Sequence, residues 1–234
     1  PYRYPNPNKI ILNRIKKELN IIHQKNFISY FLINWEITNY ARSKGYFYIG
    51  RGSGANSIIA YLLKITDVDP IELDLYFERF INFYRKTPPD FDLDFSWRDR
   101  NDIINYVFKR FPNTALIAVY NTFQYRASIR ELGKVFGLPK YEIDLISKGA
   151  STQKKSFDKL SKLVINYAKR LEGFPNYLGI HAGGIVISER PINYYTATFM
   201  SQKGYATTHF DMVTAEDIGI YKFDILSQII MSGR

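Results

Sequence analysis

The chain has 234 residues, of which 46% are hydrophobic, and this composition supports a sizeable core and excludes a disordered polar tail. It has no Cys and three scattered His, which excludes disulfides and thiolate or histidine metal cages. A net charge of +10 indicates a polyanionic partner such as nucleic acid. With no signal pattern at its start and no apolar run as long as a membrane span, the chain is expected to be cytoplasmic, without membrane contact, and a piece of a longer polypeptide.

The first part of the chain predicts two helices that lead to a glycine turn. Apolar residues recur at helical spacing over residues 11–22, and an aromatic-rich helix is expected over residues 27–42. A short strand at 46–49 is followed by Gly50-Arg51-Gly52-Ser53 and an apolar helix. This order exposes backbone N–H groups and the positive end of a helix, which is the usual basis of phosphate binding. The alternative is a glycine turn with no ligand.

A strict alternation of carboxylate and apolar residues occupies residues 89–95. In a strand, Asp90, Asp92 and Asp94 share one face, and the apolar residues share the other. Like charges at this spacing raise carboxyl pKa values or destabilise the strand, so a cation is expected among them. Oxygen ligands without His or Cys favour Mg²⁺ or Mn²⁺. The alternative is a solvated edge strand whose acidic residues point outward.

Helical stretches are expected on both sides of this strand, over residues 71–83 and 98–111, and a buried strand at 116–120. The helix that follows carries a column of cations at i, i+4 and i+8, formed by Arg126, Arg130 and Lys134. Such a column matches a triphosphate or a nucleic-acid backbone, because Arg binds phosphate oxygens in bidentate fashion. An exposed basic stripe paired locally with Glu131 is the alternative.

A second basic stretch runs from Lys148 to Arg170 and includes Lys154 and Lys155. It is interpreted either as a surface that follows phosphates or as a solvated helix face. The last part of the chain predicts strands, and in the final one Lys222 and Asp224 share a face. Two acidic strands so far apart in sequence indicate a subdomain inserted into a catalytic sheet. We expect His181 to make a local hydrogen bond rather than to bind a metal.

Several ungapped motifs, in the same order, resemble the bacterial DNA polymerase III alpha subunit, a C-family polymerase. They are Gly50-Arg51-Gly52-Ser53, Phe77-Glu78-Arg79-Phe80, Pro89-Asp90-Phe91-Asp92-Leu93-Asp94-Phe95, Ile129-Arg130-Glu131-Leu132-Gly133, His181-Ala182-Gly183-Gly184 and Lys222-Phe223-Asp224. The similarity runs from about Glu18 to Leu226. Nearly the whole chain is therefore covered by the resemblance.

The resemblance implies an α+β fold: a polymerase-beta-like nucleotidyltransferase palm, a mixed sheet with flanking helices, into which a mainly helical part of the fingers is inserted. Palm segments are expected over residues 1–120 and 176–234, and the insert over residues 121–175. The implied activity is template-directed DNA synthesis, in which a nucleotidyl group passes from a dNTP to a primer 3′-OH with two Mg²⁺ ions, for which Mn²⁺ can substitute. The implied partners are primer-template DNA, a dNTP and the remaining domains of the alpha subunit and replisome.

The same motifs imply functional residues. The metal-binding, catalytic carboxylates of the family fall on Asp92, Asp94 and Asp224, with Asp90 beside them. Nucleotide-binding residues are expected in the glycine turn, at Arg51, Gly52 and Ser53. Further nucleotide-binding residues are expected at three arginines, Arg85, Arg126 and Arg130. DNA-binding lysines are expected at Lys134, Lys154, Lys155 and Lys222.

Two other functions remain open: a non-templated, Mg²⁺-dependent nucleotidyltransferase, and a catalytically silent nucleic-acid-binding module. The presence of Asp92, Asp94 and Asp224 argues against the silent module. Dependence of incorporation on the template base separates a polymerase from the non-templated enzyme. An alpha subunit is several times longer than this chain, so the isolated chain is expected to extend primers weakly or not at all.

Overall fold

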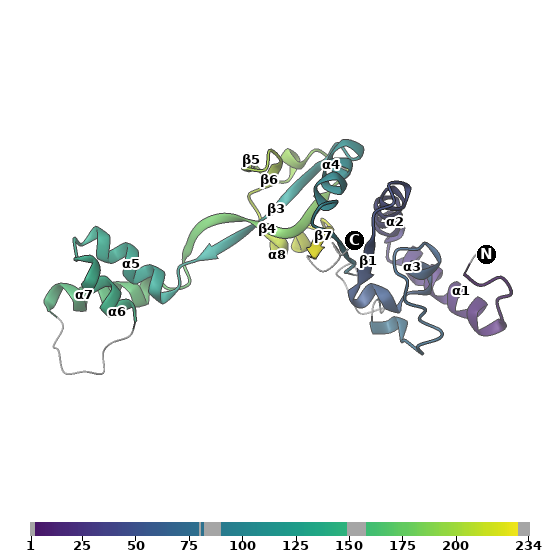
Figure 1. Cartoon of the computed structure of the whole chain (residues 1–234), viewed down its shortest axis with the longest axis horizontal. Coiled ribbons are helices and arrows are strands. Elements are labelled where there is room, and N and C mark those ends of the chain that lie inside the picture. The colour runs from purple at the N-terminus through teal and green to yellow at the C-terminus, as the bar shows by residue number, and fades with distance from the viewer. Residues whose placement is uncertain (1–2, 80, 82–89, 149–157, 229–234) are drawn as a thin grey trace. The chain divides into compact units, whose positions relative to one another are not determined.

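A computed structural model describes residues 3–79, 81, 90–148 and 158–228 of the protein. Arg85, Lys154 and Lys155 therefore lie outside the described residues. The chain divides into two compact units: unit 1 comprises Pro1–Ala118 and Ile180–Arg234, and unit 2 comprises Val119–Gly179. The described residues form a mixed α+β structure with a seven-stranded sheet and eight α-helices (Figure 1).

Four helices of unit 1 come from the first half of the chain, and their bounds agree with the predicted periodicity. The side chain of Asn8 accepts a hydrogen bond from the Ile11 N–H and so caps the first helix, and Ser57 caps the third in the same way. The helices are α1 Lys9–Gln24, α2 Ile28–Ser43, α3 Ile58–Leu62 and α4 Arg100–Arg110.

The strands follow the order β1-β2-β7-β4-β3-β6-β5 in the sheet. β2 and β7 are parallel neighbours although they come from distant parts of the sequence, and β7 also pairs with β4 in antiparallel fashion. The strand bounds are β1 Tyr48–Arg51, β2 Asp92–Ser96, β3 Thr114–Thr122, β4 Pro175–Ile187, β5 Thr198–Met200, β6 Ala206–Thr208 and β7 Lys222–Gln228. This pairing joins the two acidic strands predicted from the sequence.

The two faces of the sheet in unit 1 are covered differently. On one face Leu93, Phe95 and Ile225 are fully buried and belong to the main core with the apolar sides of α1 to α4. The other face has a smaller core, in which Val186 packs with Ala215 of α8, Met212–Asp217. Because successive strand residues alternate between faces, Asp92 and Asp224 lie on the face opposite the main core.

Unit 2 is a three-helix cluster, formed by α5 Tyr125–Val135, α6 Lys140–Ser147 and α7 Lys159–Leu171 (Figure 1). Its core contains five buried apolar residues that the helices share, Ile129, Ile143, Ile146, Val164 and Ala168. A Cβ on Gly133 would lie 2.7 Å from Cγ1 of Ile143, so the glycine allows α5 and α6 to approach closely. The predicted insert, residues 121–175, lies within this unit.

The prediction of a helix over residues 71–83 is wrong for its described part, which contains turns and one 3₁₀ turn, Phe77–Arg79. The side chain of Asp69 accepts hydrogen bonds from the backbone N–H groups of Ile71 and Glu72. The backbone N–H of Leu75 donates to the Pro70 carbonyl. Asp74 has φ of 48°, a left-handed conformation that a helix does not continue through. The acidic strand also begins later than predicted, at Asp92, so Asp90 precedes it.

Within the described residues, no helix has both the length and the apolar composition that crossing a membrane requires.

Candidate functional site

Three carboxylates meet on the sheet face opposite the main core, where β2 and β7 lie side by side. Asp92 of β2 stands directly opposite Asp224 of β7 in the parallel register. Asp90, which precedes β2, joins them, and one carboxylate oxygen from each residue lies within 4.8 Å of the others. We call these three residues the carboxylate cluster. Strand pairing therefore brings together groups that are far apart in the sequence.

Two basic side chains contact the carboxylate cluster. Lys222, two residues before Asp224 on the same face of β7, forms an ion pair with Asp224 and lies 3.8 Å from Oδ1 of Asp90. Arg51 of β1 is the cross-strand partner of Asp92, and its Nη1 donates to Asp92 Oδ2 at 3.0 Å. These cations partly compensate the negative charge that the cluster concentrates.

Burial and the neighbouring carboxylates together shift the pKa values of these groups. Burial raises the pKa of Asp90, Lys222 opposes the shift, and the charges of Asp224 and Asp92 add to it. Burial likewise raises the pKa of Asp92, against the opposing effect of Arg51. Burial by itself would lower the pKa of Lys222, but its hydrogen bond to Asp224 and the nearby carboxylates outweigh burial, so that pKa is raised.

The cluster fits a hard divalent cation. Oδ1 of Asp224 is buried and has no hydrogen-bond partner among the described residues, which is costly for a carboxylate unless a cation or water is bound there. The three nearest ligand groups are all carboxylates, the donor set that Mg²⁺ and Mn²⁺ prefer. Asp224, Asp92 and Asp90 are therefore the residues that would hold such an ion.

Asp94, which the family motif places among the metal ligands, is engaged differently from Asp92 and Asp224. Its side chain is 1% exposed, pairs with Arg51 and accepts a hydrogen bond of 2.7 Å from Nε2 of Gln228. Arg51 thus bridges Asp94 and Asp92. In this structure the residue that completes the cluster is Asp90, not Asp94.

The glycine turn lies beside the cluster. Gly52 has φ of 82°, and a Cβ there would lie 3.0 Å from Oδ2 of Asp92, so only glycine leaves the space next to that carboxylate free. Ser53 donates from Oγ to the backbone carbonyl of Asp90 at 3.4 Å, which ties the turn to the segment before β2. The turn itself is a short 3₁₀ helix, Gly52–Asn56, and Gly54 is packed against the ring of Phe91.

The other predicted basic residues that the structure describes lie in unit 2. Arg126, Arg130 and Lys134 are all exposed on α5. Arg130 lies 3.8 Å from the Asp144 carboxylate, and Lys134 donates to Glu131 at 2.8 Å, so the local pairing with Glu131 is present. Binding of a nucleotide or of DNA by these three exposed side chains of α5 stays a prediction.

Sequence reasoning missed two residues near the site. Gln228 continues the alternation that starts with Lys222 and Asp224 on β7, so the period of two could have identified it. Arg100, at the start of α4, donates to the Ile225 carbonyl beside Asp224, and nothing in its local sequence indicates that long-range contact. His181 makes the local hydrogen bond that was predicted, since its Nδ1 accepts from the Gly184 N–H at 2.7 Å.

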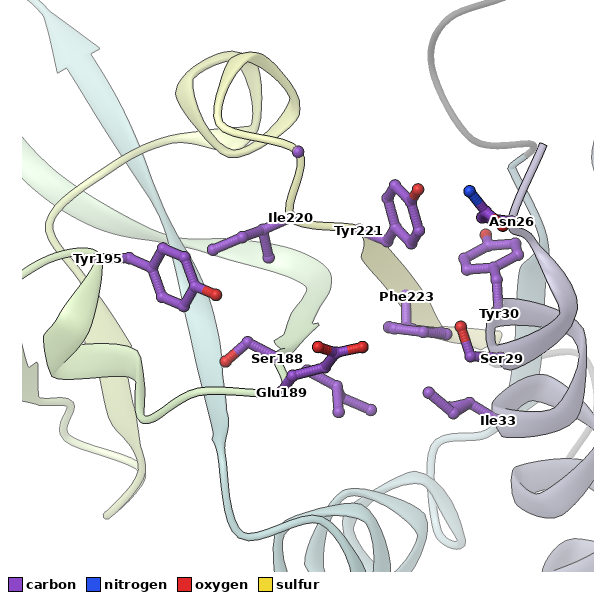
Figure 2. A pocket seen from close by; sticks show the side chains of 12 residues that line it. Asn26, Ser29, Tyr30, Ile33, Ser188, Glu189, Tyr195, Ile220, Tyr221 and Phe223 are labelled. Carbon is purple, nitrogen blue, oxygen red and sulfur yellow. The ribbon is translucent and has the colours of Figure 1, made fainter.

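A cavity of about 430 Å³ lies on the other side of β7, the side to which Phe223 points. Figure 2 shows the rings of Tyr30, Tyr195 and Tyr221 around it, together with the Glu189 carboxylate. Among the residues that the structure describes, no Lys, Arg or His lines it. Aromatic walls with one acid do not suit a phosphate, so this cavity is chemically distinct from the carboxylate face.

A mixed sheet brings three carboxylates together beside a glycine turn and two basic side chains, and this arrangement defines the class of protein by a candidate cation site on the face of its sheet. The chain belongs to the family described as the bacterial DNA polymerase III alpha NTPase domain, whose family model matches residues 2–227.

Curated relatives agree with this family. The chain is 37% identical to an error-prone DNA polymerase of Symbiobacterium thermophilum, over 96% of this chain and 23% of that protein. It is 35% identical to DNA polymerase III subunit alpha of Bacillus subtilis, over 96% of this chain and 22% of that protein. It is 38% identical to DNA polymerase III subunit alpha of Escherichia coli K12, over 91% of this chain and 20% of that protein. The chain thus spans about a fifth of the length of these relatives.

Proposed function

We propose that this chain is the catalytic palm of a template-directed DNA polymerase, with unit 2 as the inserted, mainly helical part of the fingers. The observation that carries the proposal is the register of β2 and β7, which sets Asp92 opposite Asp224 beside the glycine turn. The names of the relatives, DNA polymerase III subunit alpha and error-prone DNA polymerase, support the reaction class. A polymerase-beta-like palm is the proposed fold family.

Each side chain has a proposed role. Asp92 and Asp224 hold the divalent cations, with Asp90 completing the site in the present arrangement and Asp94 available once Arg51 releases it. Gly52 leaves room beside Asp92 for the phosphates of a dNTP, and Ser53 and Arg51 stand next to that space. When bound, two Mg²⁺ ions supply an activated primer oxygen and charge neutralisation of the leaving pyrophosphate.

The chain's own cations explain how the acidic groups remain close together before substrate binds. Arg51 and Lys222 hold four carboxylates, Asp90, Asp92, Asp94 and Asp224, in place by ion pairs. Because Arg51 contacts both Asp92 and Asp94, movement of this one guanidinium toward phosphate oxygens would remove the ion pair from both groups and leave Asp94 with its hydrogen bond from Gln228. Template bases, rather than protein side chains, select the nucleotide in this proposal.

The test is formation of a ternary complex by the 234-residue chain with Mn²⁺, a primer-template whose primer ends in a dideoxynucleotide, and a dNTP. The dNTP that complements the template base is expected to strengthen DNA binding, measured by fluorescence anisotropy, more than the other three dNTPs. Asp224→Asn should abolish this difference because Asp224 supplies a buried, unpaired carboxylate oxygen. Asp217→Asn, an exposed acid of the same unit, is the control.

A primer with a free 3′-OH separates the alternatives in a single-turnover assay. Slow incorporation that follows the template base supports the polymerase. Incorporation of all four nucleotides irrespective of the template would support the non-templated nucleotidyltransferase. Nucleic-acid binding that ignores Mn²⁺, dNTP and Asp224→Asn would contradict both enzymes and support the silent binding module.

A further inference from the structure

A pocket of about 370 Å³ in unit 1 is lined by residues of α4, β3, β4 and the turn between β5 and β6, next to the point where the pairing of β4 with β7 ends. The two strands pair from Val186 opposite Lys222 to Gly184 opposite Asp224. The lining includes Arg100, His181 and Lys203, and no Asp or Glu among the described residues lines it. Its chemistry is therefore basic, although it lies on the same sheet as the carboxylate cluster.

Arg100 provides a fixed cation in this pocket. Its Nε donates to the Ile225 carbonyl at 2.8 Å and its Nη2 donates to the Ala182 carbonyl at 2.6 Å, so the guanidinium bridges β7 and β4 beyond their last pair. It has no carboxylate partner in the part of the chain that the structure describes, and its Nη1 makes no hydrogen bond there. Burial lowers the pKa of Arg100, as expected for a cation that lacks a counter-ion.

His181 and Asn105 add neutral donors. The Nδ1 atom of His181 accepts from the backbone N–H groups of Gly184 at 2.7 Å and Gly183 at 3.3 Å, which leaves the ring hydrogen on Nε2. The Oδ1 atom of Asn105 accepts from the hydroxyl of Tyr205 at 2.5 Å, which leaves the two amide hydrogens of Asn105 for another acceptor.

Lys203 supplies a second charge from a flexible side chain. It is exposed, lies in the turn between β5 and β6, and has no ion pair among the described residues. Burial lowers the pKa of His181, with Asp224 raising it and Lys222 lowering it, which agrees with a neutral ring that donates from Nε2.

We propose that this pocket binds a phosphate group, with Arg100 and Lys203 supplying charge and with His181 and Asn105 supplying hydrogen-bond donors. The shared chemistry is a phosphate oxyanion, from either a nucleic-acid backbone or free phosphate or pyrophosphate. The competing explanation is that Arg100 only joins two separating strands. The phosphate site is separate from the carboxylate cluster, so it does not depend on the proposed polymerase reaction.

The test uses the full 234-residue chain in EDTA, which removes any metal-bridged binding at the carboxylate cluster. Calorimetry measures the binding of inorganic phosphate and of pyrophosphate to the chain, and fluorescence anisotropy measures the binding of a labelled oligothymidylate. Lys203→Glu and Asn105→Asp are expected to weaken binding by roughly tenfold each, because each places a negative charge beside the anion. Both residues are exposed, so the fold should tolerate the substitutions.

The control is Lys109→Glu, the same charge reversal at the exposed far end of α4. Loss of phosphate and pyrophosphate binding in the pocket variants identifies a free-anion site, and loss confined to the oligonucleotide identifies a backbone-phosphate site. The proposal is overturned if neither pocket variant weakens any of the probes. It is equally overturned if Lys109→Glu weakens them as much, since binding would then follow net charge alone.

Discussion

At the scale of single residues, the charge balance of the site explains why a divalent cation suits it. Four carboxylates lie on or beside one sheet face, and Arg51 and Lys222 each contact two of them. When all six groups are ionised, two negative charges remain, which one divalent ion would neutralise. The raised pKa values of Asp90 and Asp92 are consistent with that excess, after burial as the main cause.

The same contacts predict unequal roles for Asp90 and Asp94 in metal binding. Asp90→Asn should weaken Mn²⁺ binding by the isolated chain by roughly tenfold, because it removes a carboxylate of the cluster. Asp94→Asn should have a smaller effect, because Arg51 and Gln228 already occupy that carboxylate. Electron paramagnetic resonance of free Mn²⁺ measures the affinity of each variant for the ion, and Asp217→Asn is the control. A larger loss in Asp94→Asn would show that Asp94 becomes a ligand when the ion binds.

Sequence alternation predicted the shared face of Asp90, Asp92 and Asp94 but did not select the members of the cluster. Spacing treats the three acids alike, whereas the structure separates them by their partners. The position of Arg51 across from Asp92 depends on the pairing of β1 with β2, which has no local signal in the sequence. The assignment of metal ligands from the family motif stays a prediction that the two Asn variants test.

At the scale of elements, α1 is joined to the start of α3 by one buried carboxylate. Glu18 has 0% exposure, accepts hydrogen bonds from Arg14 at 2.6 Å and from the Ser57 hydroxyl at 2.9 Å, and receives the Ile59 N–H at 3.3 Å. Arg14 also donates to the Asn56 carbonyl, the last residue of the glycine turn. The position of the turn beside the carboxylate cluster therefore depends on this α1 contact.

Glu18 also predicts a pH effect on stability. Burial raises its pKa, against the opposing effect of Arg14, so the native state holds the proton more tightly than the unfolded chain. The contribution is fully present below the ordinary Glu pKa of about 4.5 and is lost as pH rises through the native value. Glu18→Gln removes this titration, so its free energy of unfolding should rise relative to wild type as pH increases over that interval.

Urea unfolding at several pH values measures this difference, and Glu72→Gln is the matched control. Glu72 is exposed, so its variant makes the same chemical change without removing a buried carboxylate, and a pH-dependent difference found only in Glu18→Gln is assigned to the buried group. A constant difference between Glu18→Gln and wild type would show that Arg14 and Ser57 compensate fully for the burial of the carboxylate. The turn would then be held by contacts other than this titrating group.

Elements were predictable from the sequence where periodicity continued over several turns. The spacing of Ile11, Ile15 and Ile22 predicted α1, and the alternation around Asp224 predicted β7. The segment after Pro70 had helical spacing as well, but the side chain of Asp69 and the left-handed Asp74 form turns instead. Side-chain to backbone bonds of this kind compete with helix formation and leave the apolar pattern unchanged.

At the scale of the whole molecule, strand order was the feature that local patterns could not supply. β2 and β7 are neighbours, and no residue of either strand encodes the pairing alone. Charge distribution, in contrast, follows directly from the sequence. Unit 2, Val119–Gly179, contains eleven basic and five acidic residues, so it carries a net charge of +6 of the total +10. Unit 2 is therefore the more basic of the two units for its size.

This distribution predicts which cations dominate electrostatic binding of DNA. Arg126 has no ion pair among the described residues, whereas Lys134 is paired with Glu131. Each cation that contacts one phosphate of a single strand contributes about 0.7 to the slope of log affinity against log salt. Arg126→Ala should therefore lower the magnitude of the slope by about 0.7, and Lys134→Ala should lower it less, because Glu131 already offsets that charge.

Anisotropy of a fluorescent oligothymidylate across a salt series measures the slope, and Lys9→Ala on α1 of unit 1 removes the same charge as a control. Because Lys9 and Arg126 are both exposed, a difference between their variants reflects where DNA lies rather than net charge. Equal slopes for the two variants would place the phosphates away from α5. That result would leave the exposed cations of α5 as a solvated stripe and would remove DNA binding from the proposed role of unit 2.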